Sequence, residues 1–233
     1  MLKGRLFIFL VMVSTFLCNI ANAEQPENTE KYNVFAIVSP NIAKAVTRAS
    51  NDIFKEEGLY SFPGRGYQVH CTLYMTLYPK DAIKEIDEKV AKIAKNIAPF
   101  GVTTNGLEIT TGDWLFINLD KSVRFQNLAD LAAKMLSPLR IKSDYIPEWA
   151  KNMPNKVAYI TKYGSPNVFD EFNPHLTITA KEDSMKLKHF IQVHEKSSYA
   201  KPINGEIIAI GYGIADKNGQ VTKPIKVYNL KGR

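Results

Sequence analysis

Apolar and polar residues follow two alternating patterns along the chain. Strands are predicted where β-branched and aromatic residues cluster, at residues 32–39, 67–78, 102–110, 114–119, 175–180, 206–215 and 225–230. Helices are predicted where apolar residues recur every three or four positions, at residues 41–57, 81–98, 122–136 and 183–195. Gly58 is expected to end the first helix and Asp81 to cap the second. Residues 157–163 fit either a strand or a short helix.

The segments between these elements carry turn-forming residues. Residues 62–66 contain one proline and two glycines, residues 137–155 contain three prolines, and residues 216–219 read as a hairpin turn. Strands and helices alternate in two similar halves. We therefore expect an α+β fold of two lobes related by a pseudo-two-fold axis, with antiparallel sheets lining a central cleft and helices outside.

The two halves share one tetrapeptide pattern, His70-Cys71-Thr72-Leu73 and His175-Leu176-Thr177-Ile178. Residues i and i+2 of a strand share a face, so each His should lie beside its Thr. Only four histidines occur in the 233 residues, and two of them stand in this pattern. On the same reasoning, Tyr74 shares the face of His70 and Thr72.

The first residues resemble an export signal. Lys3 and Arg5 precede an apolar run, and Ala21-Asn22-Ala23 fits a signal-peptidase site. We expect a signal peptide at 1–23, a disordered leader at 24–31 and one bilobal domain at 32–233. The mature protein would be periplasmic or secreted, with no membrane attachment. An uncleaved N-terminal anchor is the alternative.

Charge and cysteine content narrow the chemistry. Loss of Lys3 and Arg5 would lower the net charge from +7 to 7 − 2 = +5, which favours anionic ligands without indicating a nucleic-acid binder. The mature chain would keep only Cys71, which excludes an internal disulfide. Cys71 should point into the core, so a buried thiol is favoured over a nucleophile.

Two histidines facing each other can divide acid and base catalysis. One neutral imidazole can take a proton from an attacking water, and one protonated imidazole can give a proton to the leaving oxygen. The hydroxyls of Thr72 and Thr177 can donate to phosphate oxygens. None of these four residues is a good ligand for a hard metal ion, so the chemistry needs no metal or other cofactor.

The second motif, Phe172-Asn173-Pro174-His175-Leu176-Thr177-Ile178, resembles the Phe-x-Pro-His-hydrophobic-Thr pattern of the two-histidine (2H) phosphoesterase superfamily. That superfamily includes bacterial RNA 2′,3′-cyclic phosphodiesterases and 2′-5′ RNA ligases. The resemblance implies a metal-independent phosphodiesterase with catalytic His70 and His175, and phosphate contacts from Thr72 and Thr177. The first motif lacks the Pro-Pro-type approach loop frequent in the family, and residues 138–154 form an extra proline-rich stretch.

Two further residues are candidates for substrate binding. Tyr74 could stack on a base, and Arg65, in the loop before the first motif, could reach a phosphate. The expected substrate is a nucleotide or an RNA end with a 2′,3′-cyclic phosphate, and the protein is expected to be a monomer without a protein partner.

Other functions stay open at this point. A non-catalytic nucleotide- or RNA-binding protein would keep the same fold, and 2′-5′ ligation is a related activity. Another exported hydrolase could use Cys71 or an aspartate-rich site. His189 and His194 are five residues apart on a predicted helix, which favours surface positions over a metal site. The sequence does not decide which catalytic histidine is the acid.

Overall fold

A computed structural model describes residues 28–232 of the chain. The predicted signal peptide lies outside these residues, as do the first four residues of the predicted leader, 24–27. The leader was expected to extend to residue 31, but Thr29 already begins the first strand, so that boundary is wrong. The cause is pairing: residues 29–31 bond to the end of a neighbouring strand, from Leu77 to Pro79.

Seven strands form one antiparallel sheet. They are β1 (Thr29–Val38), β2 (Cys71–Pro79), β3 (Phe100–Ile109), β4 (Leu115–Leu119), β5 (His175–Thr179), β6 (Asn204–Ile214) and β7 (Lys226–Asn229). The strand order is β2-β1-β6-β3-β4-β5, and β7 also pairs with β6. The two strands that carry the repeated motif, β2 and β5, are therefore the two ends of the order.

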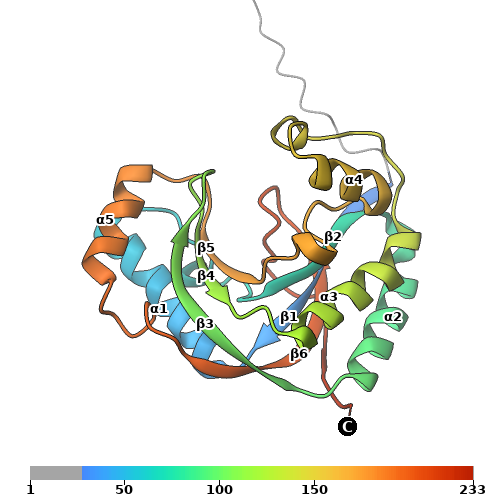
Figure 1. Ribbon diagram of the computed structural model, residues 1–233. Coiled ribbons are helices and arrows are strands. Elements are labelled where there is room, and N and C mark those ends of the chain that lie inside the picture. The colour runs from blue at the N-terminus through green and yellow to red at the C-terminus, as the bar shows by residue number, and fades with distance from the viewer. Residues whose placement is uncertain (1–27, 233) are drawn as a thin grey trace, which may run out of the picture.

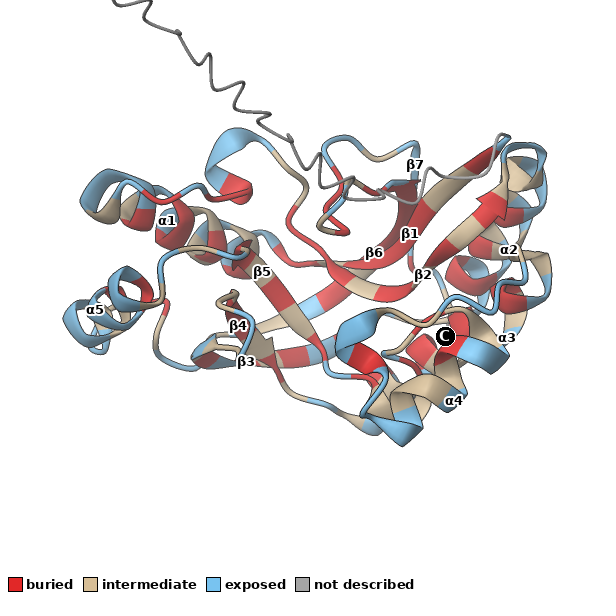
Figure 2. Ribbon diagram, turned by 90° about the horizontal axis from the view of Figure 1, so that it is seen from above, coloured by how far each residue is buried: buried red, intermediate tan, exposed pale blue. Residues whose placement is uncertain are grey.

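Five α-helices occur in residues 28–232. They are α1 (Pro40–Glu57), α2 (Ile83–Asn96), α3 (Val123–Leu136), α4 (Pro154–Tyr163) and α5 (Ser184–His194). The sheet curves into an open U, with α1 and α5 outside one arm and α2 and α3 outside the other (Figure 1). Seen from above, the buried residues follow the strands and the inner sides of these helices (Figure 2). The α+β class is confirmed.

The antiparallel sheets expected to line the cleft are parts of one continuous sheet. The first residues of β3, Phe100–Thr103, pair with β6, while its second half pairs with β4. A register shift lies inside the stretch that pairs with β4, between Thr104 and Leu107. A bulge bends a strand and increases its twist. The strand β3 thus joins the two arms of the U.

The helix ends are set by local chemistry. Gly58 follows α1 with φ = 69°, as expected of a helix stop. Ser122 accepts the backbone N–H of Phe125 at the start of α3, and Asp183 caps α5 in the same way. The expected cap at Asp81 is wrong, because a short 3-10 turn at residues 80–82 precedes α2 and no side chain caps that helix.

The proline-rich stretch leads into α4. Pro154 stands in the first turn of α4 and Gly164 ends it at φ = 70°, so residues 157–163 are a helix rather than a strand. The stretch runs along the free edge of β2, where the Ile141 N–H donates to the Leu77 carbonyl at 2.9 Å. In Figure 1, α4 lies above β2, at the open side of the U.

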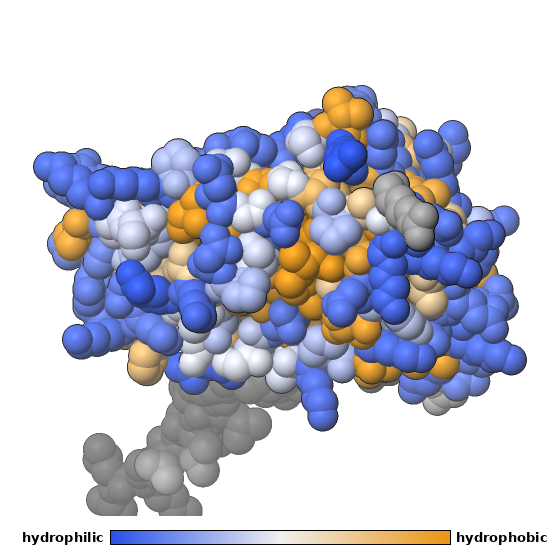
Figure 3. Space-filling view, turned by 90° about the horizontal axis from the view of Figure 1, so that it is seen from below, coloured by the Kyte–Doolittle hydropathy of each residue, from blue (hydrophilic) through white to orange (hydrophobic). Residues whose placement is uncertain are grey.

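The lower face of the molecule, opposite the opening, is shown in Figure 3. Apolar side chains gather near its middle and hydrophilic side chains surround them. Among residues 28–232, every helix is too short or too polar to cross a membrane.

Candidate active site

The two motif histidines stand at matching places in the fold. His70 directly precedes β2 and His175 is the first residue of β5. Although these strands are at opposite ends of the strand order, they are in contact. A hydrogen bond from the His175 backbone lowers the pKa of the Cys71 thiol, against the larger effect of burial. A positive charge on His175 lowers the pKa of His70. The curvature of the sheet therefore brings the two imidazoles into one site.

Both imidazoles are held by the same local bond. The Nδ1 of His70 is 2.7 Å from the carbonyl oxygen of Gln68, and the Nδ1 of His175 is 2.8 Å from that of Asn173. A carbonyl can only accept, so Nδ1 carries the hydrogen in each ring. In each neutral ring, Nε2 is then the basic nitrogen. Both histidines are therefore fixed in the tautomer that leaves Nε2 for chemistry.

A β-bulge recurs inside both motifs. Phe35 pairs with Thr72 and the next pair is Val34 with Tyr74, so Leu73 is the extra residue. In the other half, Phe116 pairs with Thr177 and the next pair is Leu115 with Thr179, so Ile178 is the extra residue. The bulge reverses the alternation of faces after each Thr.

This bulge corrects the expectation for Tyr74. Tyr74 was expected on the face of His70 and Thr72, but it pairs with Val34 on the opposite face. Its side chain is 1% exposed, and its hydroxyl donates to the carbonyl of Tyr163 at the end of α4. Tyr74 therefore packs against the α4 end and presents no stacking surface.

A phenylalanine accompanies each histidine. The Phe116 ring stacks on His175 with centroids 3.8 Å apart and an angle of 16°, and the Phe35 ring lies 5.2 Å from His70. Phe35 and Phe116 are the cross-strand partners of Thr72 and Thr177. They therefore share the inner face of the sheet with the threonines and restrict the rings of the histidines.

Asn33 on β1 belongs to this site, and the sequence analysis missed it. Its Nδ2 lies 2.8 Å from Thr72 Oγ1, 2.8 Å from the Gly219 carbonyl and 3.2 Å from His70 Nε2. The residue is 0% exposed. The sequence held one signal, since asparagine is disfavoured in strands and stands here directly before the apolar run Val34–Val38.

The two threonine hydroxyls are both able to donate. Thr72 Oγ1 accepts from Asn33, so its hydrogen is directed elsewhere. Thr177 is half-buried, and its hydroxyl has no hydrogen-bond partner within residues 28–232. Both hydroxyls therefore suit an anionic oxygen on the inner face.

Burial makes both histidines weak bases. Burial is the main cause that lowers the pKa of His70 to about 4, against smaller upward effects from the Gln68 carbonyl and Asp216. Burial also lowers the pKa of His175, opposed by the Asn173 carbonyl and Glu108. The two rings differ in exposure: His70 is 5% exposed, whereas His175 is half-buried.

Arg65 does not join the histidines. It lies in a short 3-10 turn, and its guanidinium lies 4.4 Å from the Tyr60 ring centroid and 5.0 Å from that of Phe54. These contacts hold it beside α1, away from the inner face. Cys71 is 1% exposed and burial raises the pKa of its thiol to about 12, as expected for a core cysteine.

The other two histidines lie on α5 and pair with glutamates of α1. His189 Nδ1 lies 2.6 Å from a Glu57 carboxylate oxygen, and His194 Nε2 lies 2.7 Å from one of Glu56. These pairs connect α5 to α1. His189 is exposed, as expected of a surface helix residue, whereas the His194 side chain is only 15% exposed and packs against Phe190 and Tyr199. Within the described residues, no group of three His, Cys, Asp or Glu side chains could hold a metal ion.

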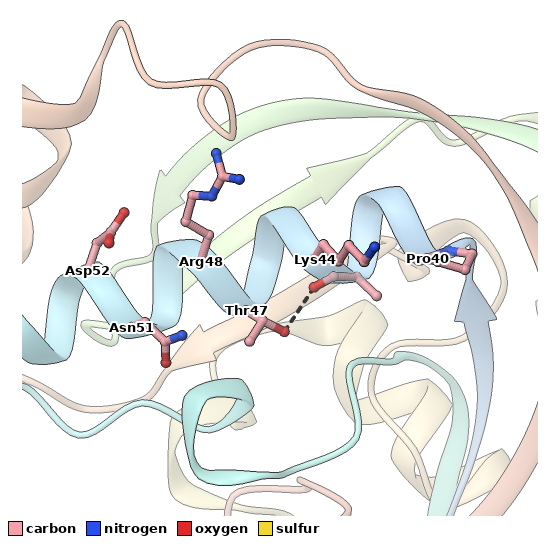
Figure 4. A pocket seen from close by; sticks show the side chains of 7 residues that line it. Pro40, Lys44, Thr47, Arg48, Asn51 and Asp52 are labelled. Atoms are coloured by element: carbon pink, nitrogen blue, oxygen red, sulfur yellow. Dashed lines mark hydrogen bonds between the residues drawn. The ribbon is translucent and has the colours of Figure 1, made fainter.

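A hollow of about 520 Å³ lies elsewhere, along the exposed side of α1 (Figure 4). It is lined by residues of that helix alone, among them Lys44, Arg48 and Asp52. None of the predicted site residues lines it. The candidate active site is therefore identified by its side chains rather than by this hollow.

Comparisons with known proteins agree with this geometry at the level of fold. Residues 74–211, more than half of the chain, match the model of the family "Protein of unknown function (DUF1045)". The chain belongs to the DUF1045 family. No curated protein matches the sequence.

Solved structures extend the likeness of this DUF1045 chain over most of its length. The crystal structure of TT0787 from Thermus thermophilus is 14% identical, with a TM-score of 0.57 and coverage of 87% of this chain and 99% of that one. Escherichia coli LigT complexed with 3′-AMP is 10% identical, with a TM-score of 0.55 and coverage of 87% and 98%. The crystal structure of a phosphoesterase is 9% identical, with a TM-score of 0.50 and coverage of 86% and 98%. The chain therefore has a LigT-like fold.

Proposed function

We propose that this protein is a metal-independent phosphodiesterase that opens 2′,3′-cyclic phosphates of nucleotides or RNA ends, using His70 and His175. We further propose that its two arms are the pseudo-symmetric lobes of the two-histidine phosphoesterase fold. The observation that carries the proposal is the duplicated arrangement of His, Thr, bulge and Phe. Each half supplies one imidazole in the same tautomer and one donor hydroxyl on the inner face.

The acid and base roles follow from the surroundings of each ring. His70, with its pKa lowered to about 4, is neutral at ordinary pH and acts as the base that takes a proton from water. His175 is half-buried, and the anionic substrate raises its pKa when it binds, so His175 is the acid. Water attacks phosphorus, His70 takes its proton, and His175 gives a proton to the departing ribose oxygen. Resemblance to the family implies a 2′-phosphate product.

The threonines stabilise the charge that develops on phosphorus. Thr72 and Thr177 donate to the two non-bridging oxygens, which gain negative charge in the transition state. Two imidazoles and two hydroxyls suit one phosphodiester group. The structure of LigT complexed with 3′-AMP supports a nucleotide as the molecule that carries this group.

Export remains part of the proposal. The first 23 residues have the pattern of a signal peptide, which favours a periplasmic or secreted enzyme acting on extracytoplasmic nucleotides or RNA fragments as a monomer. Cell fractionation of the full-length chain and N-terminal sequencing of the product test this part. An intact N-terminus in a membrane fraction would contradict cleavage.

The decisive experiment is hydrolysis by residues 24–233 in the presence of EDTA. The substrates are a 2′,3′-cyclic nucleotide and an oligonucleotide ending in a cyclic phosphate, tested beside His70→Ala and His175→Ala. His189→Ala is the matched control, since His189 pairs with Glu57 at the surface. We expect turnover in EDTA, loss of roughly 10²- to 10⁴-fold in both site variants and none in the control. Equal turnover in all variants would refute the mechanism.

A non-catalytic role in nucleotide or RNA binding is the alternative from another class. It would be favoured if the folded protein bound 2′-AMP but turned over neither substrate. Ligation at 2′-5′ bonds is tested in the same assay by adding an acceptor oligonucleotide with a 5′-hydroxyl. A Cys71 hydrolase is disfavoured, because the thiol is buried and its pKa is raised to about 12. Inactivation by a thiol-blocking reagent without unfolding would reverse that view.

A further inference from the structure

The NH₂ group of Asn33 is surrounded by more acceptors than it has hydrogens. This group has two hydrogens, but three acceptors surround it: Thr72 Oγ1, the Gly219 carbonyl and His70 Nε2. The first two contacts are 2.8 Å and the contact with His70 is 3.2 Å. The amide orientation is fixed, because the Gly219 carbonyl can only accept. The hydrogens therefore favour Thr72 and Gly219, and the lone pair of His70 Nε2 remains available.

A donor beside Nε2 has a chemical consequence. If His70 were protonated, its Nε2–H would point toward the amide donor and repel it, so Asn33 favours the neutral ring. Because Thr72 Oγ1 accepts from Asn33, the Thr72 hydroxyl hydrogen must point away from Asn33. The same amide thus acts on both the base and one phosphate-binding hydroxyl.

The bond to Gly219 connects this pair to the turn after β6. Gly219 has φ = 76°, and a Cβ there would lie 2.8 Å from the terminal methyl of Met75, so glycine fits where other residues do not. Asp216 closes the turn by accepting the N–H groups of Asn218 and Gln220, each at 2.8 Å. The turn therefore lies against β2 with the Asp216 carboxylate held in place.

We propose that Asn33 is a positioning residue: its buried amide keeps His70 neutral, orients the Thr72 hydroxyl toward the substrate and holds the 216–219 turn beside both. The part of this inference that concerns turnover rests on the proposed function. The effect of Asn33 on His70, however, exists without any substrate. The charged groups that act on His70 are His175 from β5 and Asp216 from the turn.

The first test follows the titration of the four histidines by NMR of their Cε1–H groups. Asn33→Asp places a carboxylate beside Nε2 and should raise the midpoint of His70 by about one pH unit or more. Asn33→Ala removes the donor and admits water, and should raise the midpoint of His70 by less than Asn33→Asp does. The two histidines outside the site, His189 and His194, should not move, and neither should His70 in Asn118→Ala, a matched change of the asparagine that pairs with His175. An unchanged His70 in folded Asn33→Asp would overturn the proposal.

A variant at the half-buried Thr72 tests the proposal if the variants of the buried Asn33 do not fold. Thr72→Val removes one half-buried acceptor, so an amide hydrogen turns to Nε2 and the midpoint of His70 should fall below that of the wild type. A rise would overturn the proposal.

Turnover gives the second, separate test. Asn33→Ala should lower kcat/KM about tenfold in the wild type and less than twofold in a Thr72→Ala background, because the two residues act through one bond. An equal loss of kcat/KM from Asn33→Ala in both backgrounds would overturn the proposal. If the wild type turns over nothing, the proposed function fails, whereas the NMR titration still decides the role of Asn33.

Discussion

The two motif strands share a framework and differ in their surroundings. Each has a histidine bonded to the carbonyl two residues earlier, and each has a bulge after the Thr. The Asn33 amide lies 3.2 Å from His70 Nε2 and bonds to Gly219 in the neighbouring turn, and His70 is buried. Around His175, the Phe116 ring stacks closely but the imidazole keeps part of its surface in solvent.

Under the proposed function, this difference assigns two chemical roles to one repeated motif. Deeper burial removes more solvation from a charged ring, so His70 favours the neutral form more strongly. A neutral buried ring suits a base, and a partly exposed ring suits an acid that is protonated again after each turnover. The asymmetry therefore lies in the neighbouring residues and not in the motif.

The strongest test of the comparison varies the leaving group. A nitrophenyl phosphodiester of a nucleoside expels an anion that needs no protonation, whereas a cyclic phosphate expels a ribose oxygen that does. We expect His175→Ala to lose roughly 10²- to 10⁴-fold on the cyclic substrate and far less on the nitrophenyl ester. His70→Ala should lose activity on both. The opposite pattern, measured as kcat/KM, would exchange the roles.

The pH dependence of turnover comes next in size. As the proposed base, His70 must be neutral, so kcat/KM should fall as pH drops through about 4. As the proposed acid, His175 must be protonated. Its pKa is below the ordinary 6.5, so kcat/KM should fall tenfold per pH unit above that pKa. A profile from pH 3.5 to 8 at constant ionic strength should therefore peak in the acid range. A maximum above pH 7 would contradict these protonation states.

Stability should report the burial of His70 without any substrate. The unfolded ring has a pKa near 6.5 and the folded one about 4, so the unfolded state binds more protons between these values. The free energy of unfolding should therefore fall as pH drops from 6.5 to 4, by up to about 3 kcal/mol. Urea titrations of the wild type and His70→Gln measure it, and the variant should lack this part of the fall. Equal slopes would show that His70 is not buried as a neutral ring.

The threonines should give the smallest effects. Thr72→Val and Thr177→Val each remove one hydrogen bond to phosphate, which should cost about tenfold in kcat/KM. Thr72→Val should cost more, because it also releases the Asn33 amide. Thr47→Val, a change on the exposed side of α1, is the control (Figure 4). Equal losses in both site variants would indicate that Asn33 contributes nothing through Thr72.

Much of the fold could be predicted from local patterns. The β-branched runs gave β1, β4 and β5 to within about three residues at each end, and the apolar stripes gave α1, α3 and α5. The long strand expected at 67–78 begins only at Cys71, because Gln68 bonds instead to the carbonyl of Val221. The expectation for Tyr74 failed at the bulge, which no periodicity in a single sequence reveals.

The sequence by itself predicted that each motif histidine lies beside its threonine and that Cys71 is buried. These predictions were possible because alternation along a strand is a local property. Only the tertiary structure brought the two ends of the sheet together and placed Asn33 and the 216–219 turn around His70. Those contacts join residues far apart in the chain, through a curved sheet and a bulge that reverses the faces. The pKa difference between the two histidines depends on that enclosure, since burial acts through every surrounding residue rather than through the motif.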